Sequence, residues 1–167
     1  MSQMKSAQIR PCASASDIEN ARELMRRYAR WTGVNLCFQN FEAELAELPG
    51  KYVLPRGQLW LADTQDVGEP FGVIAVRPLS DSVCEMKRLW VEPDAQGTGL
   101  GRQLAQTAIE FARTAGYTEM KLDTLRERMP AAIALYRSLG FVDTAPYIPN
   151  PEPDVIYMSL NLTAQHS

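Results

Sequence analysis

Three glycines lie within five residues of the segment Gln96–Arg102, which reads Gln-Gly-Thr-Gly-Leu-Gly-Arg. Glycine has no side chain to cover the backbone, so consecutive N–H groups of this segment stay accessible. An amphipathic pattern begins directly after it, and the first turn of a helix adds unpaired N–H groups and the positive end of the helix dipole. Phosphate and pyrophosphate bind to such a combination. The segment therefore predicts a backbone site for a phosphorylated cofactor.

The spacing of the glycines can be compared with those of two other phosphate-binding motifs. A nucleotide P-loop ends in Gly-Lys-Ser or Gly-Lys-Thr, and here Gly101 is followed by Arg102-Gln103, so that interpretation fails. The dinucleotide fingerprint G-x-G-x-x-G fails as well, because the spacing is G-x-G-x-G. A plain turn that joins a strand to a helix stays open on the loop alone, because a glycine-rich loop needs its structural context to indicate a ligand.

Other reactive side chains are sparse. The three cysteines, Cys12, Cys37 and Cys84, have no C-x-x-C spacing, so neither a disulfide framework nor a metal site is predicted. The single histidine, His166, lies in the C-terminal tail, and we assign it no role. Covalent catalysis through Cys84 is not expected, because the chain offers no histidine to activate the thiol.

Length and composition indicate one soluble α/β domain over residues 1–167, with disordered tails at 1–7 and 163–167. The formal net charge of −3 and the pI near 5.2 argue against a nucleic-acid-binding protein, which would normally carry a basic excess. The sequence has no apolar signal region and no apolar run of about 18 residues, so we expect neither secretion nor a membrane span. Unpaired cysteines fit a cytoplasmic location.

The elements that would position the loop follow from hydrophobic spacing and from glycine and proline breaks. Their order is β-α-α-β-β-β-α-β-α-β-β, which is a mixed α/β layer structure. Four prolines make the segment 145–153 a rigid loop. The expected strands are 8–12, 58–62, 71–76, 82–91, 119–123, 141–142 and 155–162, and the expected helices are 18–31, 41–48, 99–115 and 130–139.

Two motifs in the right order resemble those of the GNAT family of N-acetyltransferases. Gln96-x-x-Gly99-x-Gly101, after Val91-x-Pro93 on a strand and before a helix, resembles the acyl-CoA-binding motif of that family. The run from Ala131 through Tyr136 to Gly140-Phe141 resembles its A-x-x-x-Y-x-x-x-G-F segment. The resemblance covers roughly residues 59–162 and is strongest over 84–142.

The resemblance implies a three-layer α/β/α fold with a mixed central sheet that is splayed between the strands ending near Val91 and Asp123. Acetyl-CoA would be the cosubstrate, with its pantetheine arm in the gap. Homodimers are common in this family, so a homodimer is compatible with it. The resemblance assigns pantetheine contacts to the backbone of Leu89, Trp90 and Val91, and pyrophosphate contacts to the N–H groups of Gln96, Gly97, Thr98, Gly99, Leu100, Gly101 and Arg102.

Tyr136 is the candidate acid, because a phenol held near sulfur can protonate the CoA thiolate as it leaves. The competing interpretation is a half-buried tyrosine that packs on its own helix. An Asn is often found about seven residues before this tyrosine in the family, and here Met129 occupies the position. A side-chain contact to the cofactor there is therefore in doubt.

An ammonium acceptor must lose a proton before it can attack a thioester, so a base is also needed. Glu85 is the first candidate, because burial on its strand would raise the pKa of its carboxyl. The competing interpretation is an ion pair with Lys87 or Arg88. Asp123 is the second candidate, and its competing interpretation is a cap for the turn 124–127.

The acceptor is predicted to be a small primary amine, such as an amino acid or another amine-bearing metabolite. A protein N-terminus or lysine, or a non-catalytic acyl-CoA sensor, are the alternatives. Segment 146–151 is the expected acceptor-side wall. Arg126 and Arg128 are candidates for a carboxylate or for the 3′-phosphate of CoA, or are solvated. The residues expected to line the acceptor site are Tyr28, Trp31, Asn35, Phe38, Phe41, Tyr147 and Asn150.

Overall fold

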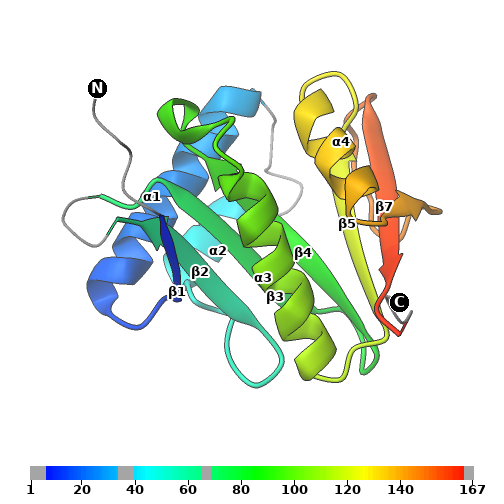
Figure 1. The fold of residues 1–167 in the computed structure, drawn as a ribbon, viewed down its shortest axis with the longest axis horizontal. Helices are drawn as coiled ribbons and strands as arrows, with labels where there is room; N and C mark the ends of the chain where they lie inside the picture. The colour runs from blue at the N-terminus through cyan, green and yellow to red at the C-terminus, as the bar shows by residue number, and fades with distance from the viewer. Residues whose placement is uncertain (1–6, 34–39, 65–68, 164–167) are drawn as a thin grey trace.

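The computed structural model describes residues 7–33, 40–64 and 69–163. Their strands form one mixed sheet in the order β1-β2-β3-β4-β5-β7-β6 (Figure 1). Neighbouring strands are antiparallel except for the parallel pair β4 and β5. The strands are β1 (Gln8–Pro11), β2 (Gln58–Asp63), β3 (Gly72–Pro78), β4 (Val83–Val91), β5 (Glu119–Leu125), β6 (Val142–Asp143) and β7 (Val155–Asn161).

Helices cover both faces of the sheet. On β2, Leu59 and Leu61 pack with the helices of one face, while Trp60 and Ala62 pack with those of the other, because alternate side chains of a strand point to opposite faces. The three-layer α/β/α arrangement is confirmed. One face carries α1 (Ala15–Thr32) and α2 (Phe41–Glu47), and the other carries α3 (Leu100–Thr114) and α4 (Pro130–Ser138), while the 3-10 turn η2 (Pro93–Ala95) precedes α3.

Every predicted helix and strand has a counterpart in the structure, and α1 shows the largest shift of a boundary. It was predicted to begin at Ile18 but begins at Ala15, because Ser14 is the N-cap. The Ser14 side chain accepts from the Asp17 N–H, and the Asp17 carboxylate accepts from the Ser14 N–H, which makes a capping box. Ser14 therefore precedes the helix as its cap, while Asp17 belongs to the first turn.

β4 and β5 are paired only along their first halves. Val83, Cys84 and Glu85 of β4 lie opposite residues 119–121 of β5, and no ladder pair is found beyond them in the described structure. β4 contains a bulge close to this separation. Val73 pairs with Trp90 and Ala75 pairs with Lys87, so two residue steps on β3 correspond to three on β4. Arg88, inside the bulge, has a φ of +62°. A bulge bends its strand and increases its twist, so the predicted splay has a local cause in β4.

The Asp17 carboxylate joins α1 to the sheet edge. Arg10 Nη1 donates to Asp17 Oδ2 at 2.9 Å, and Arg10 Nε donates to Asp63 Oδ2 at 3.0 Å. The hydrogen bond from Arg10, together with those from the N–H groups of Ala13 and Ser14, lowers the pKa of Asp17 from 3.8 to about 2. The charged carboxylate is therefore favoured in the folded state.

Asp17→Asn is expected to lower the free energy of unfolding by about 1–2 kcal/mol near neutral pH. Because the folded-state pKa of Asp17 is depressed, its contribution is complete above about pH 4 and disappears as the pH falls through about 2. Urea unfolding of the wild type and the variant across this range measures the difference. Glu110→Gln, at an exposed position on α3, is the control. A difference that stays constant from pH 7 to pH 2 would contradict the assignment.

Candidate functional site

The splay encloses a cavity of about 50 Å³ between the separated halves of β4 and β5. Both strands line it, and side chains from α1, α4 and the loop before β7 close it. Its position is the gap in which the sequence predicts the pantetheine arm. The lining residues are Tyr28, Met86, Lys87, Arg88, Leu89, Leu122, Asp123, Thr124, Leu125, Met129, Tyr136 and Asn150.

Tyr136 lies on α4, a helix that begins with Pro130 at its N1 position. Its side chain lines the cavity. Its side chain is buried and packs edge-on against Phe141 with 5.7 Å between ring centroids. Burial raises the pKa of the Tyr136 phenol, and the nearby Tyr28 and Asp123 raise it further. The hydroxyl therefore stays protonated throughout the neutral pH range.

Asp123 lies on β5 and lines the same cavity as Tyr136. Asn150 Nδ2 donates to Asp123 Oδ2 at 3.0 Å, so the loop before β7 fixes one carboxylate oxygen. The competing interpretation was that Asp123 caps the turn after β5. In that turn the Glu127 N–H donates instead to Asp154 Oδ2 at 3.2 Å. The tertiary structure thus places an acid candidate and a base candidate, 13 residues apart in sequence, at one cavity.

Glu85 is fully buried and forms the last pair of β4 with β5. It is not among the residues that line the splay cavity. Its Oε1 accepts from Arg77 Nε at 2.7 Å and lies 3.8 Å from Lys87 Nζ. Its Oε2 accepts from the Tyr147 hydroxyl at 2.6 Å. The ion pair with Lys87 expected as the alternative is present, whereas Arg88 pairs with Glu44 at 2.9 Å.

The glycine-rich loop has the geometry of an anion site. Gly97 and Gly99 have φ values of +81° and +86°, which glycine adopts without strain, and a Cβ at either position would meet no atom within 4 Å. Gly99 is the N-cap of α3 and provides no side-chain cap. The Gln103 N–H donates to the Gly99 carbonyl, while the N–H groups of residues 97–102 have no acceptor among the described residues. These N–H groups fit a pyrophosphate.

The three strand residues predicted to contact pantetheine have distinct surroundings. Trp90 is buried and lies opposite Val73 on β3, and its ring centroid is 5.8 Å from that of Trp31. Leu89 lines the splay cavity. The Val91 carbonyl accepts from Gln96 Nε2 at 2.9 Å, so the Gln96 side chain supports the end of β4. Their backbone contacts to a cofactor stay a prediction.

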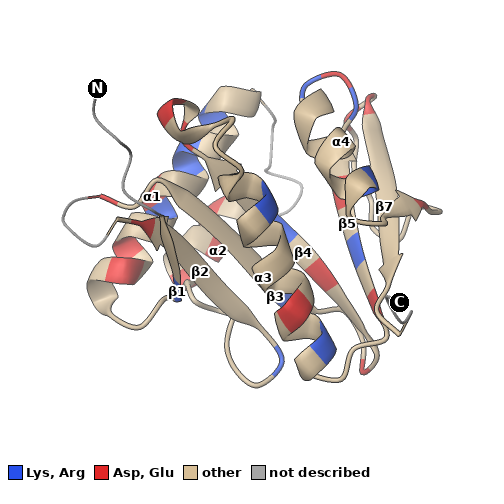
Figure 2. Cartoon of the chain, in the orientation of Figure 1, with Lys and Arg blue, Asp and Glu red and all other residues tan. Residues whose placement is uncertain are grey.

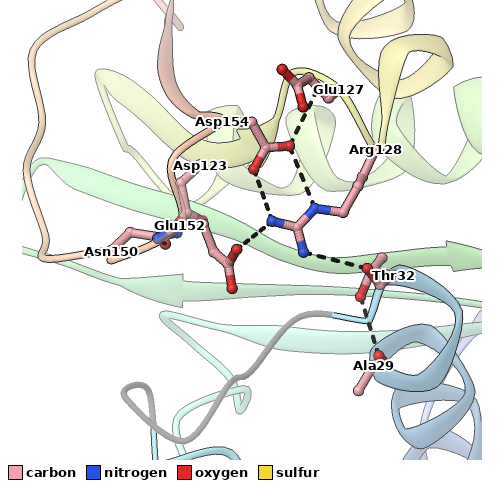
Figure 3. A network of polar contacts seen from close by, with 8 residues as sticks. All are labelled: Ala29, Thr32, Asp123, Glu127, Arg128, Asn150, Glu152 and Asp154. Atoms are coloured by element: carbon pink, nitrogen blue, oxygen red, sulfur yellow. Dashed lines mark hydrogen bonds and ion pairs between the residues drawn. The ribbon is translucent and has the colours of Figure 1, made fainter.

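Arg128 belongs to a polar network at the mouth of the splay (Figure 3). Its guanidinium pairs with Glu152, lies 2.8 Å from Asp154 Oδ1, and donates to the Thr32 carbonyl at the end of α1 at 3.4 Å. These contacts raise the pKa of Arg128 and lower that of Asp154. The sequence offered Arg128 as a carboxylate or phosphate ligand, but in the structure it joins α1 to the loop before β7. Arg126 is exposed.

A second pocket, of about 700 Å³, adjoins the splay cavity and shares Lys87 and Asn150 with it. Four residues of the segment expected to form the acceptor-side wall, Ile148, Pro149, Asn150 and Pro151, line this pocket, and its role as an acceptor site stays a prediction. The sequence did not lead us to assign its charged members to a site, although the positions of Arg77 and Lys87 within otherwise apolar strands were a usable indication. Those members are Glu44, Arg77 and Lys87.

The other described residues expected to line the acceptor site do not line this pocket. Tyr28 lines the splay cavity, and Trp31 has 59% of its surface exposed. Phe41 is buried beneath the Arg88 guanidinium, which lies 4.9 Å from the ring centroid. Tyr147 donates to Glu85. Asn35 and Phe38 fall outside the described residues.

Comparisons with known proteins agree with this geometry. The sequence model of the Acetyltransferase (GNAT) family matches residues 19–141. An uncharacterized N-acetyltransferase of Schizosaccharomyces pombe is 39% identical over 148 residues, which are 88% of this chain and 90% of that protein. Human N-acetyltransferase 8 is 28% identical over 123 residues, covering 70% of this chain and 51% of that protein.

Solved structures share the fold. A GNAT acetyltransferase of Staphylococcus aureus Mu50 has a TM-score of 0.78 at 18% identity and covers 95% of this chain and 100% of its own. The structure of yncA from Salmonella typhimurium with its cofactor acetyl-CoA has a TM-score of 0.70 at 20% identity and covers 98% of each chain. The fold is thus the GNAT fold.

The chain belongs to the GNAT family of acetyltransferases. The prediction of an acetyl-CoA-dependent N-acetyltransferase is confirmed at this level. Among the helices of residues 7–33, 40–64 and 69–163, none has the length and hydropathy needed to cross a bilayer. Within the same ranges no three His, Cys, Asp or Glu side chains are grouped so that they could hold a metal ion.

Gly101→Asp tests the loop as an anion site. A carboxylate in the first turn of α3 stabilises the helix through its dipole but occupies the same N–H groups and repels a pyrophosphate. We therefore expect an unchanged or higher melting temperature, with the Kd for acetyl-CoA raised about tenfold or more, as measured by calorimetry. Gly101→Ala is the control, because its Cβ would meet only Leu135 at 3.7 Å. Unchanged affinity in the aspartate variant would contradict the site.

Proposed function

We propose that this N-acetyltransferase transfers the acetyl group of acetyl-CoA directly to the primary amine of a small molecule, without a metal. The observation that carries the proposal is that one cavity, at the splay of β4 and β5, is lined by Tyr136 and Asp123 and adjoins a second pocket. The expected cofactor gap adjoins a separate pocket, which suits a reaction in which two substrates meet. The rigid wall 148–151 limits the second pocket to a compact acceptor.

The cofactor would be held mainly by the backbone. The N–H groups of residues 97–102 would bind its pyrophosphate, and the unpaired edge of β4 around Leu89 would accept the pantetheine amides as an added strand. The bound thioester supplies the activated acetyl group. The chain itself orients the acceptor and moves the protons.

Tyr136 is proposed as the acid. Its side chain lines the splay cavity, where the leaving sulfur of a bound thioester would lie. Burial and the neighbouring Asp123 keep the pKa of the phenol above its ordinary value, which ensures that the proton is present at working pH. Proton donation to the thiolate then makes reversal of the transfer less favourable.

For the base we propose Asp123 in preference to Glu85. A general base must reach the proton that it removes, directly or through one water. Asp123 lines the cavity, and the Asn150 amide holds one of its two carboxylate oxygens. Both oxygens of Glu85 already have partners, Arg77 and Lys87 at Oε1 and Tyr147 at Oε2, and Glu85 does not line the cavity.

Tyr136→Phe is expected to lower kcat about a hundredfold or more and to leave the KM for acetyl-CoA nearly unchanged, because only the proton donor is lost. Steady-state release of CoA thiol across the pH range measures the effect. Tyr117→Phe, which removes a hydroxyl bonded to the Arg56 carbonyl away from both pockets, is the matched control. A Tyr136→Phe enzyme with wild-type turnover at every pH would remove the acid role.

Asp123→Asn is expected to lower kcat/KM for the amine about a hundredfold or more and to abolish the rise of the rate with pH that a base produces. Glu85→Gln keeps the hydrogen bonds of that site in part, so it is expected to retain the pH profile with a smaller loss. The comparison of the two pH profiles decides between the candidates. If Glu85→Gln loses the pH-dependent rise and Asp123→Asn keeps it, the base is Glu85.

A further inference from the structure

The pocket beside the splay has an unusual lining for a site that takes an amine. Glu44, Arg77 and Lys87 supply charges of both signs, while Ile148, Pro149 and Pro151 form an apolar wall. Figure 2 shows charges of both signs along β4, within the sheet rather than at its rim. A site selective for a simple ammonium ion would be expected to present carboxylates and to avoid cations.

Arg77 stands at the rim of this pocket near the end of β3. Its side chain is 24% exposed, and its recorded hydrogen bond is the one from Nε to Glu85 Oε1. Burial lowers the pKa of Arg77, but the nearby Glu85 outweighs burial and raises it, so the guanidinium stays charged. Since a guanidinium has five N–H donors, this contact leaves donors for a second carboxylate.

Lys87 lies deeper, at the boundary between the pocket and the splay cavity, because it lines both. Its ammonium is 3.8 Å from Glu85 Oε1 and its residue is 7% exposed. Burial and the adjacent Arg88 lower the pKa of Lys87 below its ordinary value, and Glu85 and Asp123 offset only part of this. An incoming carboxylate would favour the charged form of this lysine.

The charges around the pocket constrain which ligand it can enclose. Arg77, Lys87 and Arg88 face the three carboxylates of Glu44, Glu85 and Asp123, so the cluster is already balanced. A simple alkylammonium would add an uncompensated charge to a buried cluster, which is costly. A zwitterion adds no net charge, and its two ends can meet charges of opposite sign.

We propose that Arg77 and Lys87 bind the carboxylate of the amine acceptor, so that the acceptor is an α-amino acid, or a molecule with the same amino-carboxylate group, that bears an apolar substituent. The amine would then point through the shared boundary at Asn150 toward Asp123, and the substituent would pack on Ile148, Pro149 and Pro151. This inference rests on the proposed function and names its substrate class.

The test compares three acceptors that share one side chain: L-phenylalanine, L-phenylalaninamide and phenethylamine. The amide has the less basic amine and so more of the reactive neutral form, which favours it in the absence of carboxylate recognition. We expect kcat/KM for phenylalanine to exceed both others about tenfold to a hundredfold, mainly through KM, because charge-assisted hydrogen bonds to the carboxylate are lost in the other two.

Arg77→Gln distinguishes recognition of the acceptor carboxylate by Arg77 from a structural role of Arg77 in holding Glu85. The variant is expected to lower kcat/KM for phenylalanine about tenfold or more while it leaves the value for phenethylamine within about twofold. Arg30→Gln removes an equal charge from the exposed face of α1 and is the matched control, with all three acceptors unaffected. Calorimetric binding of acetyl-CoA establishes that each variant is folded.

The outcomes distinguish the proposed acetylation of a small amine from the proposed recognition of its carboxylate. If phenethylamine or the amide is acetylated as well as phenylalanine, carboxylate recognition is overturned while the small-amine function stands. Equal losses for all three acceptors in Arg77→Gln would also overturn it, since they would indicate a structural role through Glu85. If acetyl-CoA binds but none of a broad panel of amines releases CoA thiol, the proposed function and the inference both fail.

Discussion

The partial pairing of β4 with β5 is the constraint on which the site depends. A parallel ladder holds the strands together through Glu85 and Lys121, and the bulge at Arg88 then turns β4 away. From that point each strand has an edge whose backbone groups need partners, and the space between them is a cavity. An open strand edge normally invites pairing with another chain. Here the edge lies inside the molecule, where a ligand with amide groups can pair with it.

β4 also buries three charged residues, Glu85, Lys87 and Arg88. Helices cover both faces of the sheet, so a charged side chain on either face of this strand points into a packed layer rather than to solvent. Two of them are compensated from other elements: Arg88 by Glu44 of α2, and Glu85 by Arg77 of β3 and by Tyr147 of the loop before β7. These contacts connect the cofactor gap with the neighbouring pocket and leave Arg77 and Lys87 as its cationic side.

Because the two halves of the sheet are separated at the site, contacts outside the sheet must hold them in position. On the face of α3 and α4, Arg102 donates to Ser138, and on the face of α1, Arg128 joins Thr32 to Glu152 and Asp154 (Figure 3). The second network also orders the loop that carries Asn150, whose amide holds Asp123. The width of the gap and the orientation of the candidate base thus depend on the same few polar contacts.

Residues close together in the chain were sufficient to predict the order of the elements, the helices on both faces and the glycine-rich loop before α3, because each of these depends on local patterns. The resemblance of residues 131–141 to the family motif singled out Tyr136, and the prolines marked segment 146–151 as rigid. Which charged side chains meet depends instead on how the elements pack. Glu85 found Arg77 and Tyr147, 8 and 62 residues away, and Arg128 found Thr32, 96 residues away, contacts that no local pattern encodes. The tertiary structure likewise brought Asp123 and Tyr136 to one cavity, since the separation of β4 from β5 is a property of the assembled sheet.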